Sequence, residues 1–142
     1  MMLGGYDEAR VRWTKSVLTC SLTKLLQSRG KTLSDPVWCR TTDVPVYLSS
    51  CAAVNGELVA VGGVDEGYKS TAAVHKYNPT TNSWDLISNM PTAQHQCLVA
   101  VLQTNQMIVV GGITRHFSVI TNKHEIASYL DLYMSMTDSS VQ

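Results

Sequence analysis

The sequence predicts an all-β protein built from repeated four-stranded units. A segment that begins with tryptophan and ends with proline occurs at Trp38–Pro45 and again, 46 residues later, at Trp84–Pro91. A Gly-Gly pair follows an apolar run at residues 62–63 and again, 49 residues later, at residues 111–112. A fixed period of this size is typical of a repeat architecture, in which each repeat is one supersecondary unit. The 142 residues therefore have room for one complete unit and two incomplete ones.

Composition excludes several classes of protein. Eleven Lys and Arg residues balance 11 Asp and Glu, so the formal net charge is zero and no basic excess points to nucleic acid or an anionic membrane. The first residues lack the basic and apolar regions of a signal peptide, and no apolar run is long enough to span a membrane. We therefore expect a cytoplasmic protein with neither a nucleic-acid partner nor a membrane partner.

The cysteines are expected to be reduced. Cys20, Cys39, Cys51 and Cys97 are widely spaced, with no C-x-x-C pair among them. Cys51 and Cys97 occupy the same position in two repeats, inside apolar strands, where a free thiol packs as a small hydrophobe. We expect both to be buried rather than joined in a disulfide or bound to a metal.

The first unit, residues 1–48, is expected to hold only part of the pattern. Leu3-Gly4-Gly5 is similar to the end of a strand whose beginning is missing, so the chain is expected to begin in mid-repeat. Residues 17–22 and 37–41 are predicted strands, and a long connection joins them.

The second unit, residues 49–88, contains four predicted strands. Asn55-Gly56 lies between two apolar runs and predicts a tight hairpin, because a type I′ turn needs positive φ at both central residues. The four strands are expected at Ser50–Val54, Glu57–Val61, Ala72–Tyr77 and Ser83–Ile87.

The third unit, residues 89–130, restarts the pattern. Gln96–Val101 and Met107–Val110 predict a second hairpin, and His124–Tyr129 predicts a further strand. Residues 131–142 contain no tryptophan and are expected to form an irregular tail.

Unbroken apolar runs indicate how the units pack. A run such as Leu98–Val101 directs side chains to both faces of its sheet, so both faces must be covered. Four-stranded sheets that cover one another describe a β-propeller, in which each sheet is a blade. In an incomplete ring, the outermost blades are expected to keep one uncovered face.

These residues resemble the kelch repeat. Gly62 and Gly63 after an apolar strand, then Tyr77, then Trp84, match the kelch pattern within one unit, and the period agrees with that of kelch repeats. The first unit departs from it, with Cys20 at the position of Tyr77. The resemblance implies an incomplete kelch-type β-propeller with one full four-stranded blade flanked by two partial blades. In the flanking units the matching residues are Trp38, Gly111 and Gly112.

The resemblance also implies a function. Kelch propellers resemble one another in binding partner proteins, so we expect a non-enzymatic protein-interaction module, such as the substrate-recognition part of a larger ubiquitin-ligase adaptor. Two alternatives stay open: a fragment of a kelch-like propeller enzyme with a metal or small-molecule site, and a non-functional truncated gene product. The chain could also self-associate, since further copies would supply the missing blades.

A partner-binding face is expected at one end of the blades. In an up-and-down sheet, the loops between the second and third strands and the loops between consecutive units share one end. Their residues mix charge with aromatic side chains, a composition typical of protein-recognition surfaces. The candidates are Tyr47, Asp65, Glu66, Tyr68, Lys69, Gln94, Arg115, His116 and Phe117.

No catalytic, metal or cofactor site is predicted. His95 and Cys97 form an H-x-C pair, but no further ligands follow with metal-like spacing. The Gly-Gly pairs are not phosphate loops, because G-x-G-x-x-G and a P-loop lysine are both missing. We expect the glycines to provide backbone freedom where a side chain would collide with the neighbouring blade. The tryptophans recur once per unit, which favours packing between blades over ligand binding.

Overall fold

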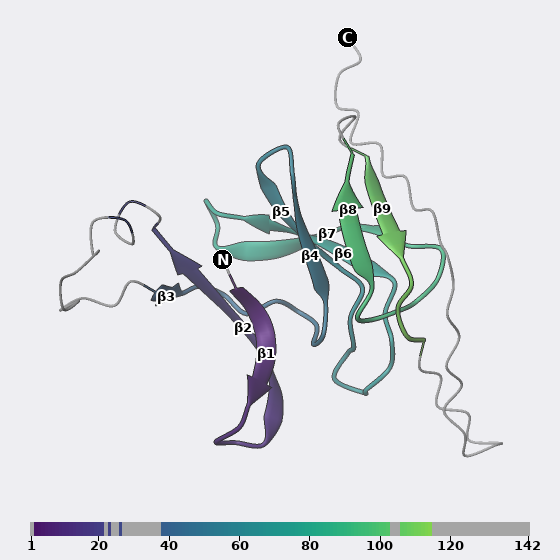
Figure 1. The fold of residues 1–142 in the computed structure, drawn as a ribbon, viewed down its shortest axis with the longest axis horizontal. Coiled ribbons are helices and arrows are strands. Elements are labelled where there is room, and N and C mark those ends of the chain that lie inside the picture. The colour runs from purple at the N-terminus through teal and green to yellow at the C-terminus, as the bar shows by residue number, and fades with distance from the viewer. Residues whose placement is uncertain (1, 22, 24–25, 27–37, 103–105, 115–142) are drawn as a thin grey trace, which may run out of the picture.

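Three antiparallel sheets lie side by side, with the largest in the middle (Figure 1). The structure is a computed structural model that describes residues 2–21, 23, 26, 38–102 and 106–114. Strands that follow each other in the sequence are neighbours in each sheet, so the chain runs up and down. This architecture confirms the predicted all-β class, with one full four-stranded blade between two partial blades.

Nine strands make up the three sheets in the described residues. The first sheet contains β1 (Met2–Asp7), β2 (Arg12–Cys20) and β3 (Trp38–Arg40). The central sheet contains β4 (Ser50–Val54), β5 (Glu57–Val61), β6 (Ala73–Asn78) and β7 (Ser83–Asn89), and the third contains β8 (Leu98–Val101) and β9 (Met107–Val110). The unit boundaries given above, at residues 48, 88 and 130, stay predictions.

The tight hairpin of the central blade is confirmed. Val54 pairs with Glu57, which leaves Asn55 and Gly56 as the two turn residues. Their φ angles are 53° and 79°, so both have the positive φ that a type I′ turn requires. This turn fixes the register of β4 against β5 and therefore decides which side chains enter the core.

The first and central blades place their tryptophans in the same register. Tyr77 pairs with Trp84 across β6 and β7, and their ring centroids are 5.3 Å apart. Cys20 pairs with Trp38 across β2 and β3. Cys20 therefore occupies the position of Tyr77, as the sequence predicted.

One expectation for the first blade was wrong. The Gly4-Gly5 pair does not end a strand, because β1 continues through it to Asp7 and forms a hairpin with β2. The register shifts here, because the two steps from Leu3 to Gly5 face the three steps from Val17 to Thr14, so the extra residue is in β2 and both glycines, with positive φ (62° and 129°), lie opposite it. Strand β2 begins at Arg12, five residues before the predicted start at residue 17.

The third blade is described only as a hairpin. Strands β8 and β9 pair in register from Leu98 opposite Val110 to Val101 opposite Met107, which agrees with the predicted hairpin. The strand predicted at His124–Tyr129 and the tail predicted at residues 131–142 lie outside the described residues.

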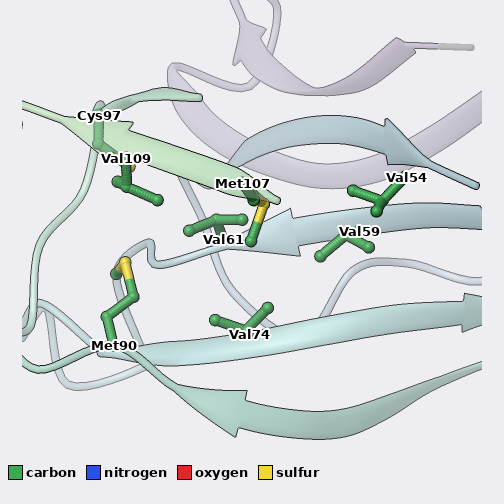
Figure 2. Close-up of a cluster of buried hydrophobic side chains, with 8 residues drawn as sticks. All are labelled: Val54, Val59, Val61, Val74, Met90, Cys97, Met107 and Val109. Carbon is green, nitrogen blue, oxygen red and sulfur yellow. The ribbon is translucent and has the colours of Figure 1, made fainter. Parts of the chain in front are cut away.

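Two apolar clusters join the three blades. Figure 2 shows the larger cluster, in which Val59, Val61 and Val74 of the central blade meet Met107 and Val109 of β9. The second cluster packs Val17 of β2 against Ala60 of β5, together with Val44 and Val46 of the connecting segment and the partly buried Trp84. Strand β5 of the central blade is therefore covered on both faces, which explains its unbroken apolar run.

The third blade has one buried and one exposed face in the described residues. Leu98 is 67% exposed and Leu102 is 40% exposed, although Val109 on the opposite face of the hairpin is fully buried. The expectation that both faces of Leu98–Val101 are covered therefore does not hold in the described residues. The exposed face is the one an outermost blade was expected to keep.

Close backbone approach explains the glycines after β5. A Cβ atom on Gly62 would lie 2.2 Å from the backbone oxygen of Gln94, and one on Gly63 would lie 2.6 Å from the backbone oxygen of Tyr47. Gln94 is on the segment that leads into the third blade, and Tyr47 is on the segment that enters the central one. Any side chain at these two positions would push the connecting segments off the end of the blade.

Buried His75 makes stability depend on pH. Its side chain is 9% exposed in β6, its Nδ1 has no hydrogen-bond partner, and burial lowers the pKa of the imidazole below its ordinary value of 6.5. As pH falls below 6.5, the unfolded chain binds the proton first, so the folded state loses stability.

We expect His75→Val to flatten this decline in stability, measured as the urea midpoint in mildly acidic buffer. Above pH 6.5 the imidazole is mostly neutral in both the folded and the unfolded chain, so the wild type and His75→Val should show the same pH dependence there. A wild-type slope retained by His75→Val would contradict this account.

Candidate partner-binding face

The loop between β5 and β6 is held in a fixed shape by Asp65. The Oδ1 atom of Asp65 accepts hydrogen bonds from the backbone N–H groups of Gly67 and Lys69, both at 2.9 Å. The backbone oxygen of Asp65 also accepts a bond from the N–H of Tyr68 at 3.0 Å. Tyr68 is thereby displayed at the tip with φ of 60° and 74% exposure.

Backbone bridges fix this loop against the segment that enters the central blade. Val64 pairs with Tyr47 on one side and with Ser70 on the other. The two Tyr47–Val64 hydrogen bonds measure 2.8 and 2.7 Å. The side chain of Tyr47 therefore lies beside the β5–β6 loop without belonging to it.

An ion pair extends the face to the first blade. The ammonium of Lys15 on β2 donates a hydrogen bond to Glu66, and this bond lowers the pKa of the Glu66 carboxyl and raises the pKa of Lys15. Lys15 Nζ also lies 5.0 Å from the centroid of the Tyr47 ring, whose hydroxyl donates to Glu66 at 3.3 Å. Three segments far apart in the sequence are thus joined at one end of the sheets.

A cleft with an aromatic lining opens between the first blade and these loops. Its volume is about 510 Å³, within the range of ligand-binding clefts. Four of its eight lining residues are aromatic, and one of these, Trp13, meets Tyr6 edge to face with ring centroids 5.2 Å apart. The lining residues are Tyr6, Val11, Arg12, Trp13, Tyr47, Leu48, Val64 and Tyr68.

The predicted site residues divide into groups in the structure. Tyr47 and Tyr68 line the cleft, and Glu66 joins Tyr47 to Lys15 beside it. Asp65 shapes the loop through its carboxylate, and Lys69 is exposed on the same loop. Arg115, His116 and Phe117 lie outside the described residues.

Gln94 is not available to a partner. Its side chain is 1% exposed, because the segment around it passes over Gly62 and Gly63 and is enclosed there. The backbone oxygen of Gln94 accepts a hydrogen bond from Gly63 at 3.0 Å. Including Gln94 in the partner-binding surface was therefore wrong.

Sequence reasoning missed half of the cleft. Tyr6, Val11, Arg12 and Trp13 come from the β1–β2 hairpin, which was interpreted as the end of one strand and a connection. The signal was present in the repeat, because the hairpin tip joins the strands equivalent to β5 and β6. The loop rule that selected the segment after Gly63 therefore selects this hairpin as well.

Other polar groups at this end are buried. His95 is 2% exposed, and its Nδ1 lies 2.9 Å from Ser70 Oγ, which also donates to the backbone oxygen of Ile113 at 3.3 Å. This arrangement ties the β5–β6 loop to the segment after β9 and gives solvent no access to the imidazole. The described residues hold no group of three or more His, Cys, Asp or Glu side chains that could bind a metal.

The cysteines are free, but their burial differs from the prediction. Cys97 is 7% exposed, and burial raises the pKa of its thiol. Cys51, expected to be buried as well, is exposed in β4, although partial desolvation also raises the pKa of its thiol. Cys51 and Cys97 occupy equivalent positions in the repeat, but their burial differs because different blades lie beside them.

Three features agree with the predicted kelch-type β-propeller: the blade topology, the strand-end glycines and the Tyr77–Trp84 pair. Residues 45–91 match the family of the Kelch motif. Among described residues, no helix has the length and apolar character needed to cross a membrane.

Two curated relatives share part of this chain. Kelch-like protein 35 of Mus musculus is 38% identical over 60 residues, which are 42% of this chain and 10% of the relative. F-box/kelch-repeat protein At1g67480 of Arabidopsis thaliana is 28% identical over 104 residues, 72% of this chain and 26% of the relative. The chain thus corresponds to a tenth and about a quarter of these relatives.

The fold is also similar to that of a solved structure. The structure of YjhT aligns with a TM-score of 0.48 and 26% sequence identity, covering 58% of this chain and 26% of that one.

Proposed function

We propose that this chain is a protein-interaction module that binds its partner in the cleft between the β1–β2 hairpin and the β5–β6 loop. The observation that carries the proposal is the convergence of four aromatic side chains from three chain segments on one open cleft. Aromatic residues are enriched at the energetic centres of protein interfaces, where they bury a large area at a small entropic cost.

A finer role follows from the family. Within a longer chain, the module would supply the substrate recognition of a ubiquitin-ligase adaptor, as the kelch resemblance implies and as the pairing of an F-box with kelch repeats in one relative's name supports. A second copy of this chain stays a predicted partner as well. It would pack on the exposed face of β8 and β9, which includes Leu98.

Truncation of Tyr68 tests the proposed function. Tyr68 is 74% exposed and packs little within the chain, so we expect Tyr68→Ala to fold normally and to lose the partner. The measurement is capture of interacting proteins from cell lysate on the immobilised chain, compared between wild type and variant by quantitative mass spectrometry. A partner in the cleft should fall at least about tenfold with Tyr68→Ala, which is the loss expected of a hot-spot aromatic residue.

Leu86→Ala is the matched control. Leu86 is 60% exposed on β7 and does not line the cleft, so its truncation removes a similar exposed apolar side chain elsewhere. Partners that are lost equally with both variants, or retained with both, would contradict the cleft as the binding site.

A further inference from the structure

We propose that the cleft selects a partner segment in which an anionic side chain lies next to an aromatic or aliphatic one, and that Arg12 is the residue that determines this specificity. The inference rests on the proposed function and adds the chemistry of the partner to it.

The charges around the cleft favour an anion. A second hollow of about 450 Å³ adjoins the cleft and shares Tyr6, Arg12, Trp13 and Tyr47 with it. Its charged lining has four cations and two carboxylates, and Glu66, which pairs with Lys15 beside it, leaves an excess of one positive charge. The charged lining residues are Arg10, Arg12, Lys15, Arg40, Asp7 and Asp43.

Every one of these cations except Arg12 forms an ion pair within the chain. Arg10 pairs with Asp7 at 3.0 Å, and Arg40 pairs with Asp43 at 2.9 Å. Lys15 pairs with Glu66. Within the described part of the chain, Arg12 takes part in no ion pair, and its side chain is exposed at the junction of the two hollows.

A free guanidinium at this position suits an anionic group. Its planar fork of N–H donors matches a carboxylate or a phosphate with two parallel hydrogen bonds. A cationic side chain of a partner would instead meet the excess positive charge of the second hollow. The preference is therefore for a partner that brings its own negative charge.

The rings beside Arg12 define the second half of the motif. Trp13 follows Arg12 directly and is held edge to face by Tyr6. Tyr47 is held by its hydrogen bond to Glu66 and by the ammonium of Lys15. These rings are fixed before a partner arrives, so an apolar side chain can pack on them at little entropic cost. A carboxylate and a phosphate share the chemistry that Arg12 recognises, and the experiment distinguishes them.

The test begins with selection of peptides on the full chain. A phage-displayed library of random peptides is selected on the wild-type protein, and we expect enrichment of peptides with an acidic residue next to an aromatic or aliphatic one. One enriched peptide is then synthesised in three forms: with the acidic residue, with its uncharged amide, and with phosphoserine in its place. Binding is measured by fluorescence anisotropy. The tighter of the acidic and phosphorylated forms identifies the source of the anion.

The Arg12→Gln variant provides the decisive comparison. We expect it to weaken the anionic peptide about tenfold, the loss of one charge-assisted interaction, and to leave the amide form unchanged. Lys76→Gln is the matched control: it removes one positive charge on β6, where Lys76 pairs with Glu57 at 3.1 Å outside both hollows. This control should change the affinity by less than about twofold. Circular dichroism confirms that both variants are folded.

The outcomes separate this inference from the proposed function. Enriched peptides that are uncharged or basic, yet lose binding with Tyr68→Ala, would overturn the anionic preference and leave the cleft as the binding site. Peptides that bind wild type, Arg12→Gln and Tyr68→Ala equally would overturn both. An equal loss of the anionic and amide forms with Arg12→Gln would also overturn the role of Arg12.

Discussion

Gly62→Ala is expected to destabilise the protein by about 4 kcal/mol, through backbone strain and overpacking together. The added Cβ atom would lie 2.2 Å from the backbone oxygen of Gln94, and backbone atoms cannot rotate away as a flexible side chain can. The φ angle of 59° adds the cost that an L-residue has in the left-handed region. The measurement is the free energy of unfolding in urea, followed by tryptophan fluorescence.

Gly111→Ala separates the two costs. Gly111 has nearly the same φ angle, 67°, but an added Cβ atom would have no neighbour within 4 Å. We expect this variant to lose only about 1 kcal/mol, the cost of the backbone conformation alone. Equal losses at the two positions would show that the approach of the Gln94 segment to Gly62 is not a tight contact.

Val109→Asp is expected to detach the third blade, at a cost of about 4 kcal/mol for an unpaired charge in an apolar core. Val109 is fully buried and contacts the central blade through the cluster that contains Val61 and Val74. Urea unfolding measures the loss, and limited proteolysis should show earlier cleavage of the β8–β9 hairpin.

Leu98→Asp places the same charge on the opposite face of that hairpin. Leu98 is 67% exposed, so we expect a change of no more than about 0.5 kcal/mol. A large loss with Leu98→Asp, or a small one with Val109→Asp, would contradict the docking of β9 on the central blade.

Much of the fold could be predicted because local rules and the repeat agreed. The Asn55-Gly56 turn determines one hairpin by its backbone preference alone, and the 46-residue period transfers the pattern to its neighbours. The first blade was only partly predicted, since one Gly-Gly pair follows the end of β5, whereas the other lies inside β1, where the register with β2 shifts. The choice between these outcomes depends on which connecting segment passes over the glycines, and that is a tertiary contact.

The candidate site was predicted in outline. The rule that loops alternate between the two ends of a sheet identified Tyr47 and Tyr68, but it could not show that Gln94 is enclosed while Tyr68 is exposed. Burial of a loop residue depends on where the neighbouring blade's backbone runs. Arg12 and Trp13 were missed because the β1–β2 hairpin was not recognised, although they contribute a cation and a large ring to the cleft.

The approach of Gln94 to Gly62 has a consequence for synthesis of the chain on the ribosome. The end of the central blade is closed by residues that follow its last strand, β7, so the blade is complete only after the segment leading into β8 has emerged. Each blade would then be completed only when the next connecting segment has emerged. A nascent chain that has emerged from the ribosome only as far as Asn89 would expose the backbone at Gly62 and Gly63 to chaperones and proteases.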